Sequence, residues 1–500
     1  MEEGIAFVSE AQVGSRARRG AVWSVAQICL RNGVSLCLTA ALARVLSADD
    51  YGLVGMVATL TGFLMVFSDM GFSWASVQRK GLTHGQVTSL FWLNVVAGFL
   101  LWVLCMVLAP GLARFFGREE LITITSILGA TFAMSGVAVQ PMALLKRAMD
   151  FRVIAEIEIA ATICGAVSAI AVAVSGGGYW ALVAQGLISA AVRSSLVLLR
   201  TSWRFKRPVK GTGVRELIAL GGLLSINDVL IFISRNLDGL LIGRVWGARE
   251  LGLYNRAYFL MLLPSSLINS VLAGLMVPSL SAFQDDREHF GTIYRRAIVV
   301  VAYIGTPMAV GLALTAAPAV ELVYGPKWGE VATILAWLSI AGISQPVYNT
   351  NGWLFTATGR GMQYLTLTLV NTILLSMVFF WTVRDGAIAV AQGYGVAMGL
   401  VIPLPALWYS HRVVGLTLTP TLRALAPVAV LNALLAVIVW LIGMSCTLIG
   451  VGGMATFAMQ VVTGVFAYLA FTPIFLSQML IGDLLPMLPE RTRRIIGRFV

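Results

Sequence analysis

The stretch ELIALGGLLSINDVLIFISRNLDGLLIGRVWGARELGLY, residues 216–254, decides how the rest of the chain is interpreted. It is long and apolar enough to cross a bilayer, which takes about 20 mostly apolar residues in a helix. Inside the apolar run it carries five polar side chains, Asn227, Asp228, Arg235, Asn236 and Asp238. Ionisable groups at membrane depth are costly and mark pathways or binding sites. The stretch therefore predicts a membrane-spanning helix with a functional face.

The stretch also holds the second copy of an internal repeat. Arg244-Val245, Ala248 and Gly252-Leu253 match Arg44-Val45, Ala48 and Gly52-Leu53 at a constant offset of 200 residues. Further along, Ala317-Pro318 and Tyr324-Gly325 match Ala109-Pro110 and Phe116-Gly117 at an offset of 208 residues. The repeat indicates two related halves, the second beginning near the middle of the chain.

The composition is that of a membrane protein. Of the 500 residues, 58% are hydrophobic and 12% are charged, and the mean hydropathy is +0.86. A soluble globular protein averages about 45–50% apolar and about 25% charged residues. The formal net charge of +12 would suggest nucleic acid in a soluble protein, but membrane topology accounts for it here. We therefore expect an all-α polytopic membrane protein without a nucleic-acid partner.

Fourteen stretches meet the length and hydropathy of a membrane-spanning helix. They lie near residues 21–43, 52–74, 87–109, 120–143, 154–175, 179–200, 217–243, 255–279, 294–316, 330–354, 363–383, 386–409, 423–445 and 454–477. With the N-terminus and the even-numbered connections inside, 24 of the 35 Lys and Arg residues lie inside, 7 lie outside and 4 fall within spans. Cytoplasmic loops carry an excess of Lys and Arg. This bias predicts that both termini are cytoplasmic.

Spans one to six then correspond to spans seven to twelve. Because each half has an even number of spans, the halves are parallel, related by a pseudo-two-fold axis along the membrane normal, an architecture used by transporters. The expected parts are a cytoplasmic tail at 1–20, an N-lobe at 21–200, a basic cytoplasmic linker at 201–214, a C-lobe at 215–410, two extra C-terminal spans at 411–480 and a basic cytoplasmic tail at 481–500. Gly395 and Gly399, spaced as G-x-x-x-G, predict a close contact between helices.

Signals for a cofactor or a metal are weak. The sequence has no G-x-x-x-x-G-K-[ST] loop for a nucleotide. The five cysteines all lie in apolar runs without metal-ligand spacing, and there are only three histidines. We expect packing roles for these residues, no cofactor, no metal site and no catalytic residue.

Arginines in the spans predict a cationic interior. They are Arg31, Arg193, Arg235 and Arg256. A desolvated guanidinium binds phosphate oxygens in a bidentate manner and keeps its charge, so these side chains suit an anionic, phosphate-linked substrate. For Arg193 and Arg256, anchoring at the membrane interface is an equal alternative.

Other polar groups add to this face. At 100° per residue, Asp228 and Arg235 fall about 20° apart on one helix, with Asn227 beside them and Asp238 about 80° away. Asp228, Asp238 and Asp69 are the candidate ion-coupling carboxylates, with an internal ion pair as the alternative. The tenth span carries SQPVYNTNGW, residues 344–353, in which Gln345, Tyr348 and Asn349 are candidates for binding sugar hydroxyls. Hydrogen bonding between helices is the alternative there.

Several longer stretches resemble one family. They are RVLSADDYGLVGM (44–56), QPMALLKRAMDFR (140–152), GGGYWALVAQ (176–185), NLDGLLIGRVWGARELGLYNRAY (236–258), VPSLSAFQDD (277–286) and YGPKWGEVATILAWLSIAG (324–342). The chain is similar to the Wzx-type flippases, the polysaccharide transporters of the multidrug/oligosaccharidyl-lipid/polysaccharide (MOP) flippase superfamily. The resemblance implies flipping of undecaprenyl-diphosphate-linked oligosaccharide repeat units across the bacterial inner membrane. It also implies alternating access between two lobes, driven by H⁺ or Na⁺ antiport.

The expected partners are the lipid-linked oligosaccharide, the coupling ion, membrane lipids and the polysaccharide polymerase machinery. The alternatives are a lipid II or drug exporter of the same superfamily and, from a different class, a membrane enzyme that uses lipid-linked sugars. An interior richer in Arg than in carboxylates disfavours cationic drugs. No connection is long enough for a soluble catalytic domain, and no D-x-D-type metal motif is present.

Overall fold

The computed structural model describes residues 10–68, 83–201 and 214–479. Within these ranges, side chains at 10–22, 24–25, 214–228, 266–271, 273–275 and 476–479 lie outside the description. The elements are helices, as expected from the composition. The chain divides into two compact units, Met1–Asn255 and Arg256–Val500. Residues 1–9 of the expected tail at 1–20, the whole expected tail at 481–500 and almost all of the expected basic linker at 201–214 lie outside the described residues. The rest of the expected N-terminal tail continues as the start of a helix, Glu10–Val45.

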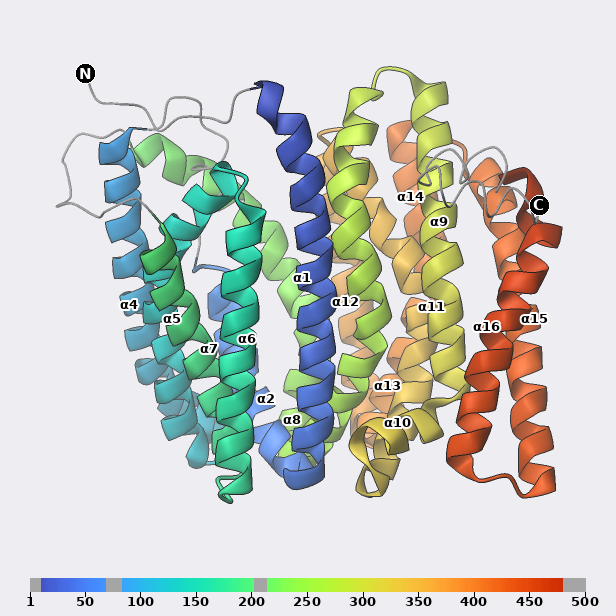
Figure 1. The fold of residues 1–500 in the computed structure, drawn as a ribbon, viewed down its shortest axis with the longest axis horizontal. Coiled ribbons are helices and arrows are strands. Elements are labelled where there is room, and N and C mark those ends of the chain that lie inside the picture. Colours follow the sequence, from blue (N-terminus) through green and yellow to red (C-terminus); the bar gives the residue numbers. More distant parts are fainter. Residues whose placement is uncertain (1–9, 69–82, 202–213, 480–500) are drawn as a thin grey trace. The chain divides into compact units, whose positions relative to one another are not determined.

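The first unit contains seven labelled elements in the described ranges (Figure 1). They are α1 (Glu10–Val45), α2 (Ala48–Met65), α4 (His84–Phe116), α5 (Glu120–Arg147), α6 (Phe151–Val174), α7 (Trp180–Arg200) and the beginning of α8 (Val214–Ala282). Glycines allow α4 and α5 to pack closely. A Cβ on Gly98 of α4 would overlap the carbonyl oxygen of Phe132 of α5, and a Cβ on Gly136 of α5 would lie 2.5 Å from the carbonyl oxygen of Asn94 of α4. Small residues at helix contacts are how membrane helices approach each other closely.

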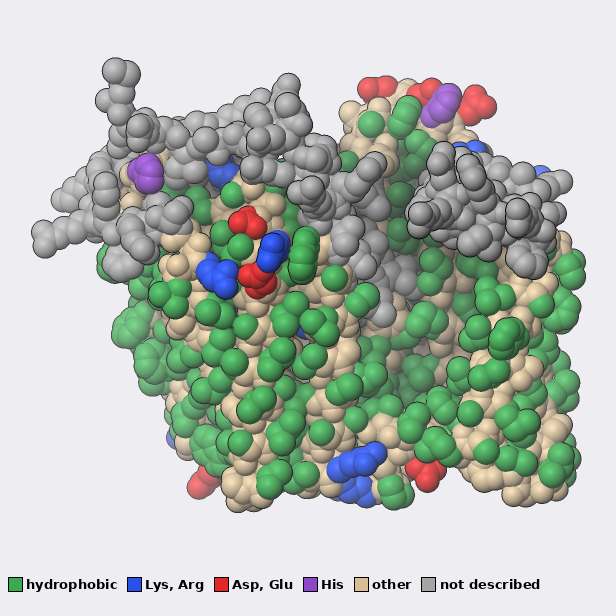
Figure 2. Space-filling view, in the orientation of Figure 1, with side chains coloured by type: hydrophobic (Ala, Val, Ile, Leu, Met, Phe, Trp, Pro, Cys, Tyr) green, Lys and Arg blue, Asp and Glu red, His purple; other side chains and the backbone are tan. Residues whose placement is uncertain are grey.

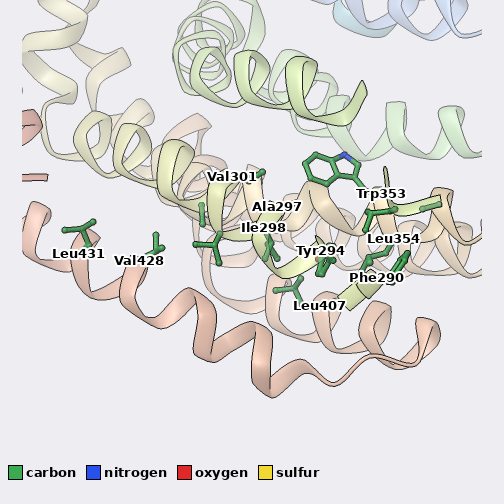
Figure 3. Close-up of a cluster of buried hydrophobic side chains, with 14 of the residues drawn as sticks. Phe290, Tyr294, Ala297, Ile298, Val301, Trp353, Leu354, Leu407, Val428 and Leu431 are labelled. Atoms are coloured by element: carbon green, nitrogen blue, oxygen red, sulfur yellow. The ribbon is translucent and has the colours of Figure 1, made fainter. Parts of the chain in front are cut away.

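The second unit begins within α8. It continues with α9 (Arg287–Leu314), α10 (Ala316–Tyr324), η1 (Pro326–Trp328), α11 (Gly329–Ala357), α12 (Gly361–Thr382), η2 (Val383–Asp385), α13 (Ala387–Val396), the π-helical η3 (Ala397–Val401), α14 (Pro403–Val414), α15 (Leu418–Ile449) and α16 (Gly453–Met479). A core cluster from α9, α11, α14 and α15 includes Tyr294, Ile298, Leu354, Leu407 and Leu431 (Figure 3). The cluster joins α15, the first of the two helices that lie outside the sequence repeat, to the rest of this unit.

The G-x-x-x-G spacing in the twelfth span makes the predicted close contact. A Cβ on Gly395 would overlap the carbonyl oxygen of Trp337, and one on Gly399 would lie 2.9 Å from the carbonyl oxygen of Ile340. Both partners belong to α11, so α13 and η3 pack backbone to backbone against that helix.

Eleven helices in the described residues are long and apolar enough to cross a membrane. They coincide with eleven of the expected spans, including the two at 294–316 and 330–354 that prolines interrupt. The other three expected spans fall on α2 and on the two parts of α8, which adjoin residues outside the description. On the side shown in Figure 2, hydrophobic side chains cover most of the length of the described helices. The chain is therefore a multi-pass membrane protein.

The helix α8 consists of two helices separated at one residue. Gly247 has φ 84° and ψ −173°, which is not helical. A side-chain-bearing residue rarely adopts such a positive φ, whereas glycine does so without a Cβ penalty. The Leu251 side chain, which follows the break, contacts two glycines that precede it. It lies 3.5 Å from the Cβ position of Gly239 and 3.1 Å from that of Gly243. Residues 248–255 therefore fold back along the first part of α8, and the expected spans at 217–243 and 255–279 are separate helices.

The two copies of the sequence repeat contact each other directly. A Cβ on Gly52 of α2 would overlap the carbonyl oxygen of Ala248, and a Cβ on Gly252 would overlap the carbonyl oxygen of Ala48. One turn further along, Gly55 and Asn255, which are also separated by the repeat offset of 200, contact each other: the Cβ position of Gly55 is 2.5 Å from Nδ2 of Asn255. Gly52 corresponds to Gly252 in the repeat, and Ala48 corresponds to Ala248. Such a reciprocal pair of contacts between equivalent residues is the signature of a two-fold axis. We call this contact between residues 48–55 and 248–255 the α2–α8 crossing.

Polar side chains cap helices in both units. Ser47 and Asp50 form a capping box at the start of α2, with Ser47 N–H donating to Asp50 at 2.8 Å. Such a cap satisfies otherwise unpaired backbone donors. At the start of α9, the backbone N–H of His289 donates to the Asp286 carboxylate at 3.1 Å, which holds the pKa of that carboxyl below its usual range.

Candidate functional site

Two arginines lie inside the membrane layer with their side chains exposed. Arg31 is in α1 and Arg235 is in the first part of α8. Along a helix rising 1.5 Å per residue, Arg31 is about 21 Å from Val45 and Arg235 is about 18 Å from Gly247. Since the charged turns near 44–50 and 244–250 end these helices, both guanidiniums fall within a hydrocarbon layer about 30 Å thick. Neither makes an ion pair with another described residue.

Asp238 is a buried carboxylate held by hydrogen bonds. It is 4% exposed. The Tyr254 hydroxyl donates to its Oδ2 at 2.6 Å, and the backbone N–H of Gly239 donates to its Oδ1 at 2.8 Å. Among the described residues no basic side chain forms an ion pair with it. Among the described residues, Asp238 is therefore held by hydrogen bonds and not by the internal ion pair that was the alternative.

Arg193 is placed differently from Arg31 and Arg235. Its guanidinium forms an ion pair with Glu158 of α6, in which Nη2 donates a hydrogen bond to Oε2 at 3.0 Å and Nε lies 2.9 Å from Oε1. The neighbouring Glu156 pairs with Arg152 at 2.9 Å and with Arg200 at 3.1 Å. Figure 2 shows acidic and basic side chains gathered over the upper part of α6. The charge of Arg193 is thus already matched within the first unit.

We expect the pair to contribute to stability. Replacing Glu158 with Gln leaves a guanidinium within the membrane helices without its counter-charge, which should lower the free energy of unfolding by about 1 kcal/mol. The double variant Glu158→Gln/Arg193→Gln should recover most of this loss, because no lone charge remains. Thermal unfolding in detergent measures both, and Glu156→Gln, at a more exposed carboxylate, is the control. Equal stability of all variants would contradict the prediction.

Arg256 lies just inside the second unit and is half-buried. Its Cζ is 5.6 Å from the centre of the Phe259 ring, and its backbone carbonyl accepts a hydrogen bond from the Tyr324 hydroxyl at 3.1 Å. A guanidinium over an aromatic face is stabilised by the ring quadrupole. This contact orients the Arg256 side chain.

The polar run on α11 divides into two groups. The first joins helices: Ser344 donates to the Met398 carbonyl at 2.5 Å, Asn371 donates to the Tyr348 hydroxyl at 2.6 Å, Thr350 bonds Tyr294 at 2.8 Å, and Ser410 donates to Asn351 at 2.6 Å. The second group is Gln345, 5% exposed with its Oε1 unpaired among the described residues, and the half-buried Asn349, for which no hydrogen bond is found there. Gln345 and Asn349 therefore keep hydrogen-bonding capacity for a ligand.

Asp69 lies outside the described residues, as do the side chains of Asn227 and Asp228. No group of three or more His, Cys, Asp and Glu side chains in the described part of the chain has the arrangement of a metal site.

Two partners were missed from the sequence. They are Glu158, which pairs with Arg193, and Tyr254, which bonds Asp238. The signal for Tyr254 was present in the repeat, because residues 244–253 copy a turn between two spans. When a chain turns back on itself, residues that precede and follow the turn by similar numbers of positions come to lie side by side, as Asp238 and Tyr254 do.

Comparison with known proteins gives a consistent assignment. The family model described as "Polysaccharide biosynthesis protein" matches residues 41–333. The chain is 26% identical to the teichuronic acid biosynthesis protein TuaB of Bacillus subtilis (strain 168), over 90% of this chain and 94% of TuaB. It is 25% identical to the lipopolysaccharide biosynthesis protein WzxC of Escherichia coli (strain K12), over 75% of this chain and 77% of WzxC. It is also 25% identical to the succinoglycan biosynthesis transport protein ExoT of Rhizobium meliloti (strain 1021), over 81% and 82%.

Solved structures agree on the fold. The lipid II flippase MurJ in an inward closed conformation has a TM-score of 0.75 at 14% identity, covering 92% of this chain and 99% of MurJ. An inward-facing multidrug resistance transporter of the MATE family and MOP superfamily has a TM-score of 0.63 at 15% identity, covering 79% and 98%. At these identities the likeness concerns the fold alone.

Proposed function

The chain belongs to the polysaccharide biosynthesis protein family of membrane transporters, and from this premise we propose that it flips undecaprenyl-diphosphate-linked oligosaccharide repeat units across the bacterial inner membrane. The sugar head of such a molecule is too polar to cross hydrocarbon unaided, while its lipid tail can remain in the bilayer. The protein then supplies a polar path for the head only. The glycan would serve exopolysaccharide, O-antigen or capsule synthesis.

The observation that carries this proposal is the exposure of Arg31 and Arg235 within the membrane layer. On insertion scales an Arg at the centre of a helix in lipid costs about 2.5–3.5 kcal/mol. A water-filled cleft removes that cost and leaves two guanidiniums available to phosphate oxygens. The diphosphate is the part of the substrate that this charge suits, and the same charge disfavours cationic drugs.

The transport cycle that we propose uses twelve of fourteen spans in two parallel six-helix lobes, at 21–200 and 215–410, with two extra spans at 411–480 and both termini cytoplasmic. The repeat supports this arrangement because its two copies meet in a two-fold contact. Alternating exposure of a cleft between lobes is the usual working mode of repeat-built transporters. The proposed substrate surface is completed by Arg256, Asn227, Gln345, Tyr348 and Asn349, and by Arg193 as an ion pair with Glu158 rather than as a free cation. Of these, Gln345 and Asn349 have the freest polar groups for sugar hydroxyls.

Ion coupling is the finer part of the proposal. Asp238, Asp228 and Asp69 are the carboxylates that we propose for binding H⁺ or Na⁺. Asp238 has the best support, because it is buried in the apolar helices and forms no ion pair with a described residue. Ionisable groups in such positions mark ion and proton pathways.

Reconstitution tests the function directly. The purified protein is placed in liposomes that contain a lipid-linked oligosaccharide in the outer leaflet, and an impermeant glycosidase reports how much remains outside. We expect the protected fraction to rise with time and to depend on an ion gradient. A lipid-linked muropeptide and a cationic dye serve as competing substrates. Chemical turnover of the lipid-linked sugar without any change in its sidedness would instead support a membrane enzyme.

A further inference from the structure

Asp238 and Tyr254 join the two parts of α8 across the break at Gly247. Asp238 precedes the break by nine residues and Tyr254 follows it by seven, and their side chains meet at 2.6 Å. Tyr254 is 1% exposed, so the hydrogen bond is closed off from water and lipid. Since Gly247 has no atom within 4 Å of its Cβ position, local packing there does not fix the angle of the break. Contacts further along α8 must do so.

One turn of α8 is held on two opposite sides. Tyr254 comes two residues after Gly252, which is about 200° around a helix. Gly252 faces the Ala48 carbonyl in the α2–α8 crossing, and Tyr254 faces Asp238 on the other side. The position of this turn therefore decides both contacts together. A shift that breaks the Asp238–Tyr254 hydrogen bond also moves Gly252 relative to α2.

We propose that Tyr254 is a positioning residue that links the ion-binding carboxylate Asp238 to the α2–α8 crossing. Each oxygen of Asp238 accepts one hydrogen bond, Oδ2 from the Tyr254 hydroxyl and Oδ1 from the Gly239 N–H. An ion that binds Asp238 neutralises the carboxylate and weakens the charge-assisted hydrogen bond from Tyr254, and so loosens the turn that carries Gly252. The crossing is thereby tied to the occupancy of a carboxylate within the membrane. This link rests on the proposed function for its purpose, but the contact itself can be tested without transport.

The experiment measures the crossing by crosslinking. In a variant without native cysteines, Gly55→Cys and Asn255→Cys place two thiols where Asn255 Nδ2 now lies 2.5 Å from the Gly55 Cβ position. A short bifunctional thiol reagent in isolated membranes reports how often the crossing is closed. The control pair is Thr382→Cys with Gly393→Cys, where a glycine of α13 faces a side chain of α12 at 2.8 Å. Both pairs are read in the same preparations.

We expect Tyr254→Phe to slow crosslinking at 55–255 by about tenfold, the size expected for loss of one hydrogen bond to a charged group, and to leave the 382–393 pair unchanged. Asp238→Ala should have the same effect, and the double variant should be no worse than either. Tyr324→Phe removes an equally buried hydroxyl that bonds a carbonyl instead, and should change neither pair.

Three results would overturn the link. They are unchanged 55–255 crosslinking in Tyr254→Phe, an equal loss at both cysteine pairs, and additive effects of the Asp238 and Tyr254 substitutions. Failure of the 55–255 pair to react in the otherwise unaltered background, while the control pair reacts, would also overturn it. Failure of the proposed function would appear separately, as absent flipping in the liposome assay with normal crosslinking.

Discussion

Replacing Arg31 or Arg235 with Gln should lower the appearance of repeat units on the far side of the membrane by at least tenfold. Each variant removes one charge-assisted hydrogen-bonding group within the membrane layer, and such a bond is worth about 1.5–3 kcal/mol. Radiolabelled or antibody-detected repeat units in the periplasm, normalised to the amount of protein in the membrane, measure the effect. Lys should restore only part of the activity, because it lacks the planar fork that binds phosphate oxygens.

The matched control for these variants is Arg384→Gln. Arg384 is also exposed, but it lies in η2 at the very end of the apolar span Gly361–Asp385, not near its middle. The net charge changes equally, so only the position within the membrane differs. Undiminished export in both Arg31→Gln and Arg235→Gln, at normal expression, would remove the support for a cationic path.

Replacing Gly52 or Gly252 with Ala should disrupt the α2–α8 crossing. The added Cβ overlaps a backbone carbonyl oxygen in each case, and no choice of rotamer moves a Cβ. The helices must separate, and overpacking of this kind costs about 1–3 kcal/mol or more. We expect a lower unfolding temperature in detergent and a severe loss of transport for either variant.

The double variant at the crossing makes the sharper test. One outward movement of α2 relieves both overlaps, so Gly52→Ala/Gly252→Ala should cost clearly less than the two single changes added together. Gly111→Ala is the control, because nothing lies within 4 Å of its Cβ position in α4. Strict additivity, or wild-type behaviour of both single variants, would contradict a shared close contact.

The sequence predicted the apolar helices well because a membrane imposes a simple rule. A span must satisfy its backbone hydrogen bonds internally and present apolar side chains to lipid. Length and hydropathy therefore suffice, even where Pro307 and Pro346 interrupt the pattern within α9 and α11. The repeat likewise indicated that α8 must turn near Gly247. The backbone φ there is 84°, a value that glycine adopts readily and other residues rarely do.

The partners of the polar side chains could not be predicted in the same way. Arg31, Arg193 and Arg235 have the same residue type and similar apolar neighbours in sequence, yet among the described residues only Arg193 has a carboxylate from another helix beside it. The polar run of α11 is similar, since Tyr348 bonds α12 while Gln345 finds no described partner for its Oε1. Which helix faces a polar residue depends on packing across segments far apart in the chain.

By itself, then, the sequence determined an all-helical membrane chain with a two-fold repeat and charged groups at membrane depth, because each of these properties follows from local composition and spacing. Only the tertiary structure decided that Glu158 neutralises Arg193, that Tyr254 holds Asp238, and that the glycines of the repeat touch each other's backbone. Those contacts join residues 16 to 204 positions apart, and no local pattern fixes which of them meet.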